Sequence, residues 1–134
     1  MNISLNHCFL SVDDYDAALT FYRDVLGFEV QNDVGKGNMR WITVSPPGQP
    51  DLSIVLSPPV PQGSPEDQEA IRAMMAKGIF GMLVFTTDDV DKLFEQVAAA
   101  GTDVIQEPTD QPWGPRDCAF RDPAGNTLRF NQKA

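Results

Sequence analysis

The sequence predicts an α+β fold made of two tandem βαβββ modules whose strands form a curved, cavity-enclosing mixed sheet. Three observations support this prediction. A strand-like segment, a helix-like segment and a glycine follow one another twice in the chain. Three shorter strand-like segments follow each occurrence, and a PxG turn precedes the last strand both times. One such module is too small to bury a face of its own sheet, so we expect the two modules to pack together around a pocket.

The first module covers residues 1–58 approximately. Residues 3–12 are largely apolar and predict a strand, after which Asp13 and Asp14 are suited to cap a helix. The helix is indicated by apolar residues at helical spacing, and Gly27 ends it. These residues are Tyr15, Ala18, Leu19, Tyr22 and Leu26. We expect Phe21 and Tyr22 to lie in the core. The three strands that follow are expected at residues 28–31, 39–44 and 52–56.

The linker and a short helix occupy residues 59–77 approximately. A proline-rich stretch leads to Ser64, which can cap a helix that begins at Pro65 and carries Glu66 and Asp67 in its positively polarised first turn. Gly78 ends this helix. Its apolar stripe is formed by Ala70, Ile71, Met74 and Met75. The stripe predicts packing on the body of the protein or on a second chain, and a methionine-lined lid over a ligand is the alternative.

The second module covers residues 78–134 approximately. Residues 79–86 predict a strand, and Asp88 or Asp89 can cap the helix that ends before Gly101. The helical spacing is carried by Val90, Leu93, Phe94 and Val97. The three following strands are expected at residues 103–106, 118–121 and 127–131.

The register of the two modules indicates an internal duplication. When Asp14 is aligned with Asp89, a single one-residue gap also brings Gly27 onto Gly101. The turn PPGQ at 46–49 matches PAGN at 123–126. We therefore treat residues 1–134 as one domain with two related halves.

Composition narrows the class of protein. With 134 residues, 42% hydrophobic and 22% charged, the chain has the make-up of one soluble domain. No apolar run is long enough to cross a membrane and the N-terminus lacks a signal pattern, so we expect a cytoplasmic protein. A net charge of −9 argues against nucleic acid and anionic membranes as partners and favours a neutral or cationic partner. Cys8 and Cys118 stand singly, which predicts packing roles in a reducing compartment, with a redox role as the weaker alternative.

Three segments together resemble the vicinal oxygen chelate superfamily, which comprises glyoxalases, bleomycin resistance proteins and extradiol dioxygenases. They are NHCFLSVDDYDAALTFYRDVLGFEV, GMLVFTTDDVDKLFEQVAAAG and PWGPRDCAFRDPAGNTLRF. The last is the most specific, because a strand, a DP-x-GN turn and a further strand close the second module in this family. The resemblance implies the glyoxalase/bleomycin-resistance fold and a homodimer. It does not identify a reaction, since one fold hosts many activities.

Metalloenzymes of the family place one metal ligand on the first strand and one on the last strand of each module. When the resemblance is applied to this sequence, the ligand positions on the first strands are His7 and Met82. The position on the last strand of the second module, where the family has a glutamate, is Arg129. In the first module the position is Ser53 or Val55, which point to the same face of a strand. A guanidinium cannot replace a carboxylate ligand, and the chain has one histidine, so we expect no metal and no cofactor.

A cavity without a metal would bind an organic ligand through apolar walls and a few polar anchors. The wall candidates are Phe9, Trp41, Met82, Val84 and Trp113. Trp113 lies in the turn PWGPRD and could stack on a planar ligand. For either tryptophan the alternative is a place in the hydrophobic core. The anchor candidates are His7, as a hydrogen-bond donor or base, and Arg129, as an anion anchor. For His7 the alternative is a buried side chain whose hydrogen bonds are satisfied by a neighbour. For Arg129 the alternative is an ordinary salt bridge with an acidic residue.

Two functions follow from these residues. The first is a binding protein that sequesters a small aromatic or cationic compound. The second is a metal-independent isomerase or lyase in which His7 acts as a base and Arg129 holds an anion. A metal-dependent glyoxalase or dioxygenase is the interpretation that similarity alone suggests, and the residues at the ligand positions argue against it. P-loop, GxGxxG, GxSxG and HExxH motifs do not occur.

Overall fold

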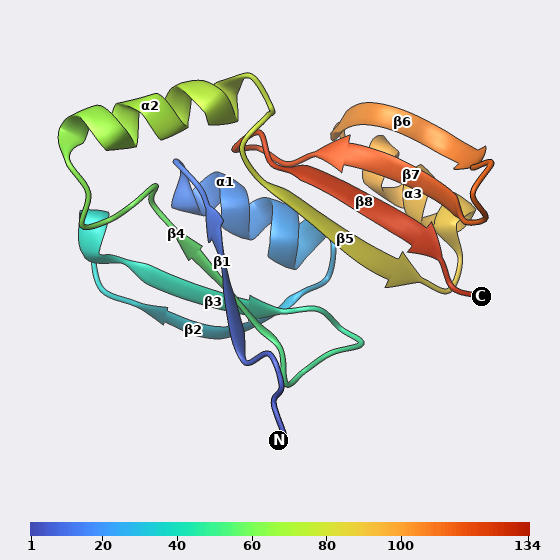
Figure 1. Ribbon diagram of the computed structural model, residues 1–134, viewed down its shortest axis with the longest axis horizontal. Helices are drawn as coiled ribbons and strands as arrows, with labels where there is room; N and C mark the ends of the chain where they lie inside the picture. The colour runs from blue at the N-terminus through green and yellow to red at the C-terminus, as the bar shows by residue number, and fades with distance from the viewer. The chain divides into compact units, whose positions relative to one another are not determined.

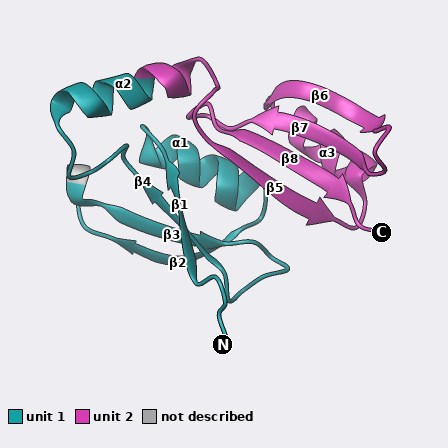
Figure 2. Cartoon of the chain, in the orientation of Figure 1, with its two compact units in different colours: residues 1–72 teal, residues 73–134 magenta. Residues whose placement is uncertain are grey.

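The computed structural model describes residues 1–134 apart from the side chain of Asn38. Figure 1 shows the order of the elements along the chain. They are β1 (His7–Ser11), α1 (Tyr15–Leu19), η1 (Thr20–Val25), β2 (Glu29–Val34), η2 (Gly37–Met39), β3 (Trp41–Ser45), β4 (Ser53–Ser57), α2 (Pro65–Ala76), β5 (Met82–Thr87), α3 (Val90–Ala99), β6 (Asp103–Asp110), β7 (Arg116–Arg121) and β8 (Thr127–Gln132). The chain divides into two compact units, residues 1–72 and 73–134, with the boundary inside α2 (Figure 2).

Each unit contains one four-stranded mixed sheet of the same topology. The strand order is β1-β4-β3-β2 in the first unit and β5-β8-β7-β6 in the second. The first strand of each unit pairs in parallel with the last, and the other pairs are antiparallel. A β-bulge interrupts β2 between Val30 and Asn32 and β6 between Val104 and Gln106. The predicted pair of βαβββ modules is therefore confirmed, down to a shared bulge.

The helices begin where polar side chains cap them. Asp14 Oδ1 accepts a hydrogen bond of 3.0 Å from the Ala17 N–H, and Asp89 Oδ1 accepts one of 3.1 Å from Lys92. Ser64 Oγ accepts one of 3.1 Å from Asp67. Each bond satisfies an amide that has no partner within its helix. The predicted caps at Asp14 and Ser64 are confirmed. Of Asp88 and Asp89, which the sequence left open, Asp89 is the cap.

The first helix differs from the single α-helix that the sequence predicts. After Leu19 it continues as the π-helical turn η1, in which the Leu26 N–H donates to the Phe21 carbonyl five residues earlier. The wider turn accommodates Phe21 and Tyr22, whose rings lie 5.0 Å apart and are both buried. Core placement of these two residues is confirmed. Helical spacing alone does not distinguish an α-helical from a π-helical turn.

One face of each sheet packs against the helix of its own unit. In the first unit this core contains Leu10, Val12, Tyr22, Ile42, Val44, Ile54 and Leu56, and in the second Val90, Val97, Cys118, Phe120, Leu128 and Phe130. The Phe94 ring of α3 stacks on Phe120 of β7 at 5.3 Å. Burial of these side chains supplies most of the stability of each unit, at roughly 25 cal/mol per Å² of apolar surface removed from water.

The turn DPAGN, residues 122–126, fixes the approach of the second unit's last strand. Asp122 Oδ1 accepts hydrogen bonds from the Ala124 and Asn126 amides at 2.9 and 2.8 Å, and Oδ2 accepts one from Asn126 Nδ2 at 2.9 Å. Gly125 has a φ of 95°, and a Cβ there would overlap the Met75 carbonyl oxygen at the end of α2. The glycine of this motif therefore makes room for the linking helix.

Candidate functional site

Each sheet also has a face opposite its helix, and the sequence-predicted site residues of the strands lie on these two faces. We call them the α1-distal face and the α3-distal face. The α1-distal face carries His7, Phe9, Trp41, Thr43, Ser53 and Val55. The α3-distal face carries Met82, Val84, Gln106, Asp117, Ala119 and Arg129. Strand alternation explains both sets, since every second side chain points to the same side.

An aromatic pair dominates the α1-distal face. The Phe9 and Trp41 rings meet edge to face, with centroids 5.8 Å apart and an interplanar angle of 78°. The two residues are 62% and 41% exposed, so core packing is the wrong interpretation for Trp41. Between their strands Val55 and Thr43 are buried and pair in register. The face is an apolar surface on a regular sheet.

His7 lies at the beginning of the same face. It is exposed and pairs in register with Ser53, whereas Val55 pairs with Phe9. Among the described residues, none forms a hydrogen bond or ion pair with the His7 side chain. The alternative of a buried, satisfied histidine is wrong for this structure.

A polar network occupies the α3-distal face. Arg129 donates from both terminal nitrogens to Gln106 Oε1, at 3.2 and 3.1 Å. Gln106 Nε2 donates to Asp117 Oδ1 at 2.8 Å, and Gln111 Nε2 donates to the same oxygen at 2.8 Å. Arg129 NH1 lies 3.9 Å from Asp117 Oδ2. Asp117 is buried, so Arg129 compensates a carboxylate that is shielded from water.

The internal duplication shows how the two faces differ at matching positions. Gln106 matches Asn32, because each follows the bulge of its strand. Asp117 matches Trp41, because each is the first residue of its strand, β7 or β3, on the distal face. Arg129 matches Val55, since each pairs with the third residue of its unit's first strand. The same backbone therefore presents an aromatic surface in one unit and, in the other, an ion pair whose two members are both hydrogen-bonded to Gln106.

The residues at the family's metal-ligand positions do not fit a metal ion. Of Ser53 and Val55, the residue that matches Arg129 is Val55, and it faces the same side of the first sheet as His7. Met82 and Arg129 face the same side of the second sheet. Only His7 is a common divalent-metal ligand, and the guanidinium of Arg129 repels cations. In the part of the chain that the structure describes, no group of three or more His, Cys, Asp or Glu side chains could hold a metal ion.

Trp113 stands apart from these networks. It lies in the turn between β6 and β7 and is 73% exposed, so core packing is the wrong interpretation for this tryptophan too. The next residue, Gly114, has a φ of 135°, which only glycine adopts readily. Met82 and Val84 are also exposed, on the edge strand β5.

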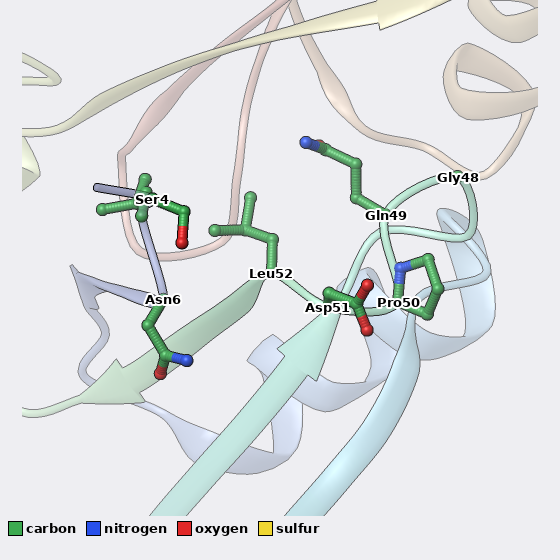
Figure 3. Close-up of a pocket in the computed structure, with 8 residues that line it drawn as sticks. Ser4, Asn6, Gly48, Gln49, Pro50, Asp51 and Leu52 are labelled. Carbon is green, nitrogen blue, oxygen red and sulfur yellow. The ribbon is translucent and has the colours of Figure 1, made fainter. Parts of the chain in front are cut away.

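Sequence reasoning missed a hollow of about 670 Å³ at the end of the first sheet. Figure 3 shows its lining, which comes from the segment before β1 and from the turn between β3 and β4. The lining residues are Ser4, Leu5, Asn6, Gly48, Gln49, Pro50, Asp51 and Leu52. The Ser53 amide bonds to the Asn6 carbonyl at 3.1 Å and joins the two segments next to His7. A hollow made by a turn leaves no periodic signal in a sequence.

Sequence reasoning also missed an arginine clamp that occurs in both units. Arg40 reaches Asp33 at 2.8 Å and Asp16 at 3.4 Å, and Arg116 reaches Asp91 at 2.7 Å and Asp110 at 3.3 Å. Hydrogen bonds from the arginines hold the pKa of Asp33 and of Asp91 below the usual range of a carboxyl. The internal duplication was the available signal, because it aligns Asp16 with Asp91 and Arg40 with Arg116, whereas Asp33 and Asp110 stand at different positions of their strands.

The cysteines take packing positions. Cys118 is buried in the second core, and burial raises the pKa of its thiol to about 11. Cys8 is half-buried, and burial raises its thiol pKa as well. A high pKa keeps a thiol protonated and unreactive. The packing interpretation fits these positions.

Comparison with known proteins supports the resemblance. The sequence profile of the Glyoxalase/Bleomycin resistance protein/Dioxygenase superfamily matches residues 4–130. YurT of Bacillus subtilis is 34% identical over 91% of this chain and 93% of its own length, and a Shewanella frigidimarina protein is 30% identical over 99% and 98%.

Solved structures agree with the fold. UcmS2 superposes with a TM-score of 0.86 at 34% identity, covering 99% of this chain and 100% of UcmS2. TnmS3, an antibiotic binding protein from Streptomyces sp. CB03234, superposes with a TM-score of 0.76 at 30% identity, covering 100% of this chain and 99% of TnmS3. No helix among the described residues is long and apolar enough to cross a membrane.

Proposed function

Because the chain belongs to the glyoxalase/bleomycin resistance protein/dioxygenase superfamily, we propose that it is a small-molecule-binding protein that sequesters an aromatic or cationic compound without a metal ion. The family alone does not select this function, since it also contains enzymes. The choice rests on the side chains that stand on the two distal faces.

The observation that carries the proposal is the exposed Phe9–Trp41 pair. Two large aromatic rings held 5.8 Å apart on a regular sheet leave apolar surface in contact with water. A planar ligand that covers them gains the hydrophobic free energy of that surface, and a cationic ligand gains a further cation–π attraction. His7, on the same face, offers a polar anchor. In the second unit, Met82, Val84 and Trp113 are exposed apolar side chains that we propose as ligand contacts of that unit.

The similarity to TnmS3 supports the choice of ligand. That protein is an antibiotic binding protein and is 30% identical to this chain over almost its whole length. We therefore place aromatic antibiotics first among the candidate ligands. The net charge of −9 favours neutral or cationic members of that group.

The proposal is tested by thermal unfolding in the presence of a panel of aromatic antibiotics, bleomycin included, with and without EDTA. We expect at least one compound to raise the melting temperature in both conditions, because binding to the folded state alone stabilises it. Phe9→Ala and Trp41→Ala should abolish the shift. Ile3→Ala removes a still more exposed apolar side chain outside the strands and should preserve the shift. A shift that disappears with EDTA would contradict the metal-free site.

We also propose a cytoplasmic homodimer. β5 is an edge strand of its sheet, and an edge strand presents backbone groups that can pair with a second 14.7 kDa chain. Sedimentation velocity at micromolar concentration should show twice the mass of the chain. A monomer over the whole concentration range would contradict the dimer.

A second proposal is a metal-independent isomerase or lyase with His7 as base and Arg129 as anion anchor. The observation in its favour is that the His7 imidazole is exposed and not engaged by a described residue. Against it, Arg129 already donates to Gln106. If a substrate is found, His7→Ala and Arg129→Gln should each lower kcat at least tenfold, and an unchanged rate in either variant would end this proposal.

A further inference from the structure

We propose that Asp117 and Arg129 together bind a neutral, planar head group that carries a hydrogen-bond donor beside an acceptor, as a primary carboxamide does. This inference rests on the proposed binding function and specifies the ligand chemistry of the α3-distal face.

Asp117 has one carboxylate oxygen that is fully used and one that is not. Oδ1 accepts from Gln106 and Gln111, both at 2.8 Å. For Oδ2, no described group donates a hydrogen bond, and its nearest charged neighbour is Arg129 NH1 at 3.9 Å, beyond hydrogen-bond length. The Asp117 side chain is only 5% exposed. Oδ2 itself can be reached from solvent, so a donor on a ligand can bond to it without displacing Gln106 or Gln111 from Oδ1.

Arg129 has donors that the network does not use. Of its five N–H groups, one on each terminal nitrogen is bonded to Gln106, and no other described group accepts from this side chain. The Arg129 side chain is 30% exposed. An acceptor oxygen on a ligand can therefore meet Arg129 while a neighbouring N–H or O–H meets Asp117 Oδ2.

The charges select a neutral group. Asp117 carries −1 and Arg129 carries +1, so the pair as a whole is neutral. An anion drawn to Arg129 would be repelled by Asp117, and a cation drawn to Asp117 would be repelled by Arg129. A neutral donor–acceptor group satisfies both residues without leaving either charge unbalanced.

The neighbouring side chains on β5 provide a wall. Ala119, the register partner of Arg129 on β7, is buried between Arg129 and Gln106, which bond to each other. Val84 is the register partner of Arg129 on β5 and is exposed, as is Met82. A ring attached to the head group can therefore rest on Val84 and Met82, which is the usual combination of an apolar wall with a polar anchor.

Three isosteric probes separate the charge classes: benzamide, benzoate and benzamidine. They share ring, shape and planarity and carry charges of 0, −1 and +1 at pH 7. When the ¹⁵N-labelled full chain is titrated with each probe and followed by NMR, the chemical shifts of the Asp117, Ala119 and Arg129 amides should change. We expect benzamide to bind at least about tenfold more tightly than either charged probe.

Two variants test the mechanism by reversing the preference. Asp117→Asn retains hydrogen-bonding capacity towards Gln106 and Gln111 but gives the pair a net charge of +1, so benzoate should become the preferred probe. Arg129→Gln gives a net charge of −1, so benzamidine should become preferred. Asp103→Asn makes the same charge change at an exposed position and should keep the wild-type order.

The inference would be overturned if all three probes bound equally, or if the chemical-shift changes were confined to other residues. It would also be overturned if a folded variant kept the wild-type order of preference. The proposed function has a separate readout, because antibiotic binding on the α1-distal face depends on Phe9 and Trp41. Loss of selectivity for benzamide with antibiotic binding intact refutes the head-group chemistry alone. Loss of antibiotic binding with benzamide selectivity intact refutes the aromatic site.

Discussion

The α1-distal and α3-distal faces share their topology and a bulge but differ in chemistry. Where the first unit has Trp41 and Val55, the second has Asp117 and Arg129. The first face uses exposed aromatic rings, and the second balances a buried charge with hydrogen bonds from two glutamines. The comparison teaches that a duplicated scaffold can keep its backbone while its two copies acquire separate binding chemistries.

The largest expected effect comes from moving a charge between the faces. Val55 is fully buried and has no acidic residue in the position that Asp117 takes for Arg129. Val55→Arg should therefore lower the free energy of unfolding by about 3–5 kcal/mol, since the charge is buried without compensation. Val55→Ile is the control that adds bulk without charge, with a cost of about 1 kcal/mol. Urea denaturation measures both, and equal stabilities would contradict the comparison.

The turns before the last strands provide the next test. Gly125→Ala places a methyl group on the Met75 carbonyl at a positive φ, so it should cost about 2–4 kcal/mol. Gly48 is the matching glycine of the first unit, and a Cβ there meets nothing within 4 Å. Gly48→Ala should change the free energy of unfolding by less than about 0.5 kcal/mol. Similar losses in the two variants would show that the turns do not differ as described.

The arginine clamps predict a smaller, pH-dependent effect. Asp33 and Asp91 have pKa values below the usual value of 3.8, so the native state stabilises their charged forms. This contribution is complete above the unfolded pKa and is lost as the pH falls below about 4 through the folded values. Melting temperatures measured from pH 7 to pH 3 should fall less steeply in Arg40→Gln and in Arg116→Gln than in the wild type. Parallel curves would contradict a role for the clamps in stability.

The smallest effect concerns the thiols. Cys118 is buried with a pKa of about 11, whereas Cys8 is only half-buried. A thiol reagent at pH 8 should therefore label Cys8 first and Cys118 only on unfolding. The Cys8→Ser variant should show almost no labelling in the native state. Rapid labelling of that variant would mean that the second core opens readily.

Most of the fold was predictable because it depends on local signals repeated twice. Apolar spacing, caps such as Asp14 and Ser64, and the glycines at the helix ends each have a physical cause that acts within a few residues. What local signals did not show was the π-helical turn η1, in which the Leu26 N–H bonds to a carbonyl five residues back instead of four.

The polar network was not predictable for a different reason. The bulge before Gln106 adds a residue to β6 and breaks the period-two pattern that would assign its side chain to a face. The expected strand begins at residue 118, which leaves Asp117 in the turn PWGPRD, whereas β7 begins at Arg116 and places Asp117 on the sheet. Its partner Gln111 lies outside that strand. Arg129 was identified as a site residue, but its partners become visible only when three strands are brought into register.

The most direct test of the aromatic site is the fluorescence of single-tryptophan variants. Trp41 and Trp113 are the two tryptophans of the chain, so Trp113→Phe leaves Trp41 as the reporter and Trp41→Phe leaves Trp113. Each variant would be titrated with an antibiotic that stabilises the wild type, with N-acetyltryptophanamide correcting for absorption by the ligand. The account predicts saturable quenching of Trp41 in Trp113→Phe, and its loss when Phe9→Ala is added. Unchanged Trp41 emission at a ligand concentration that saturates the wild-type protein would contradict a ligand site on the α1-distal face.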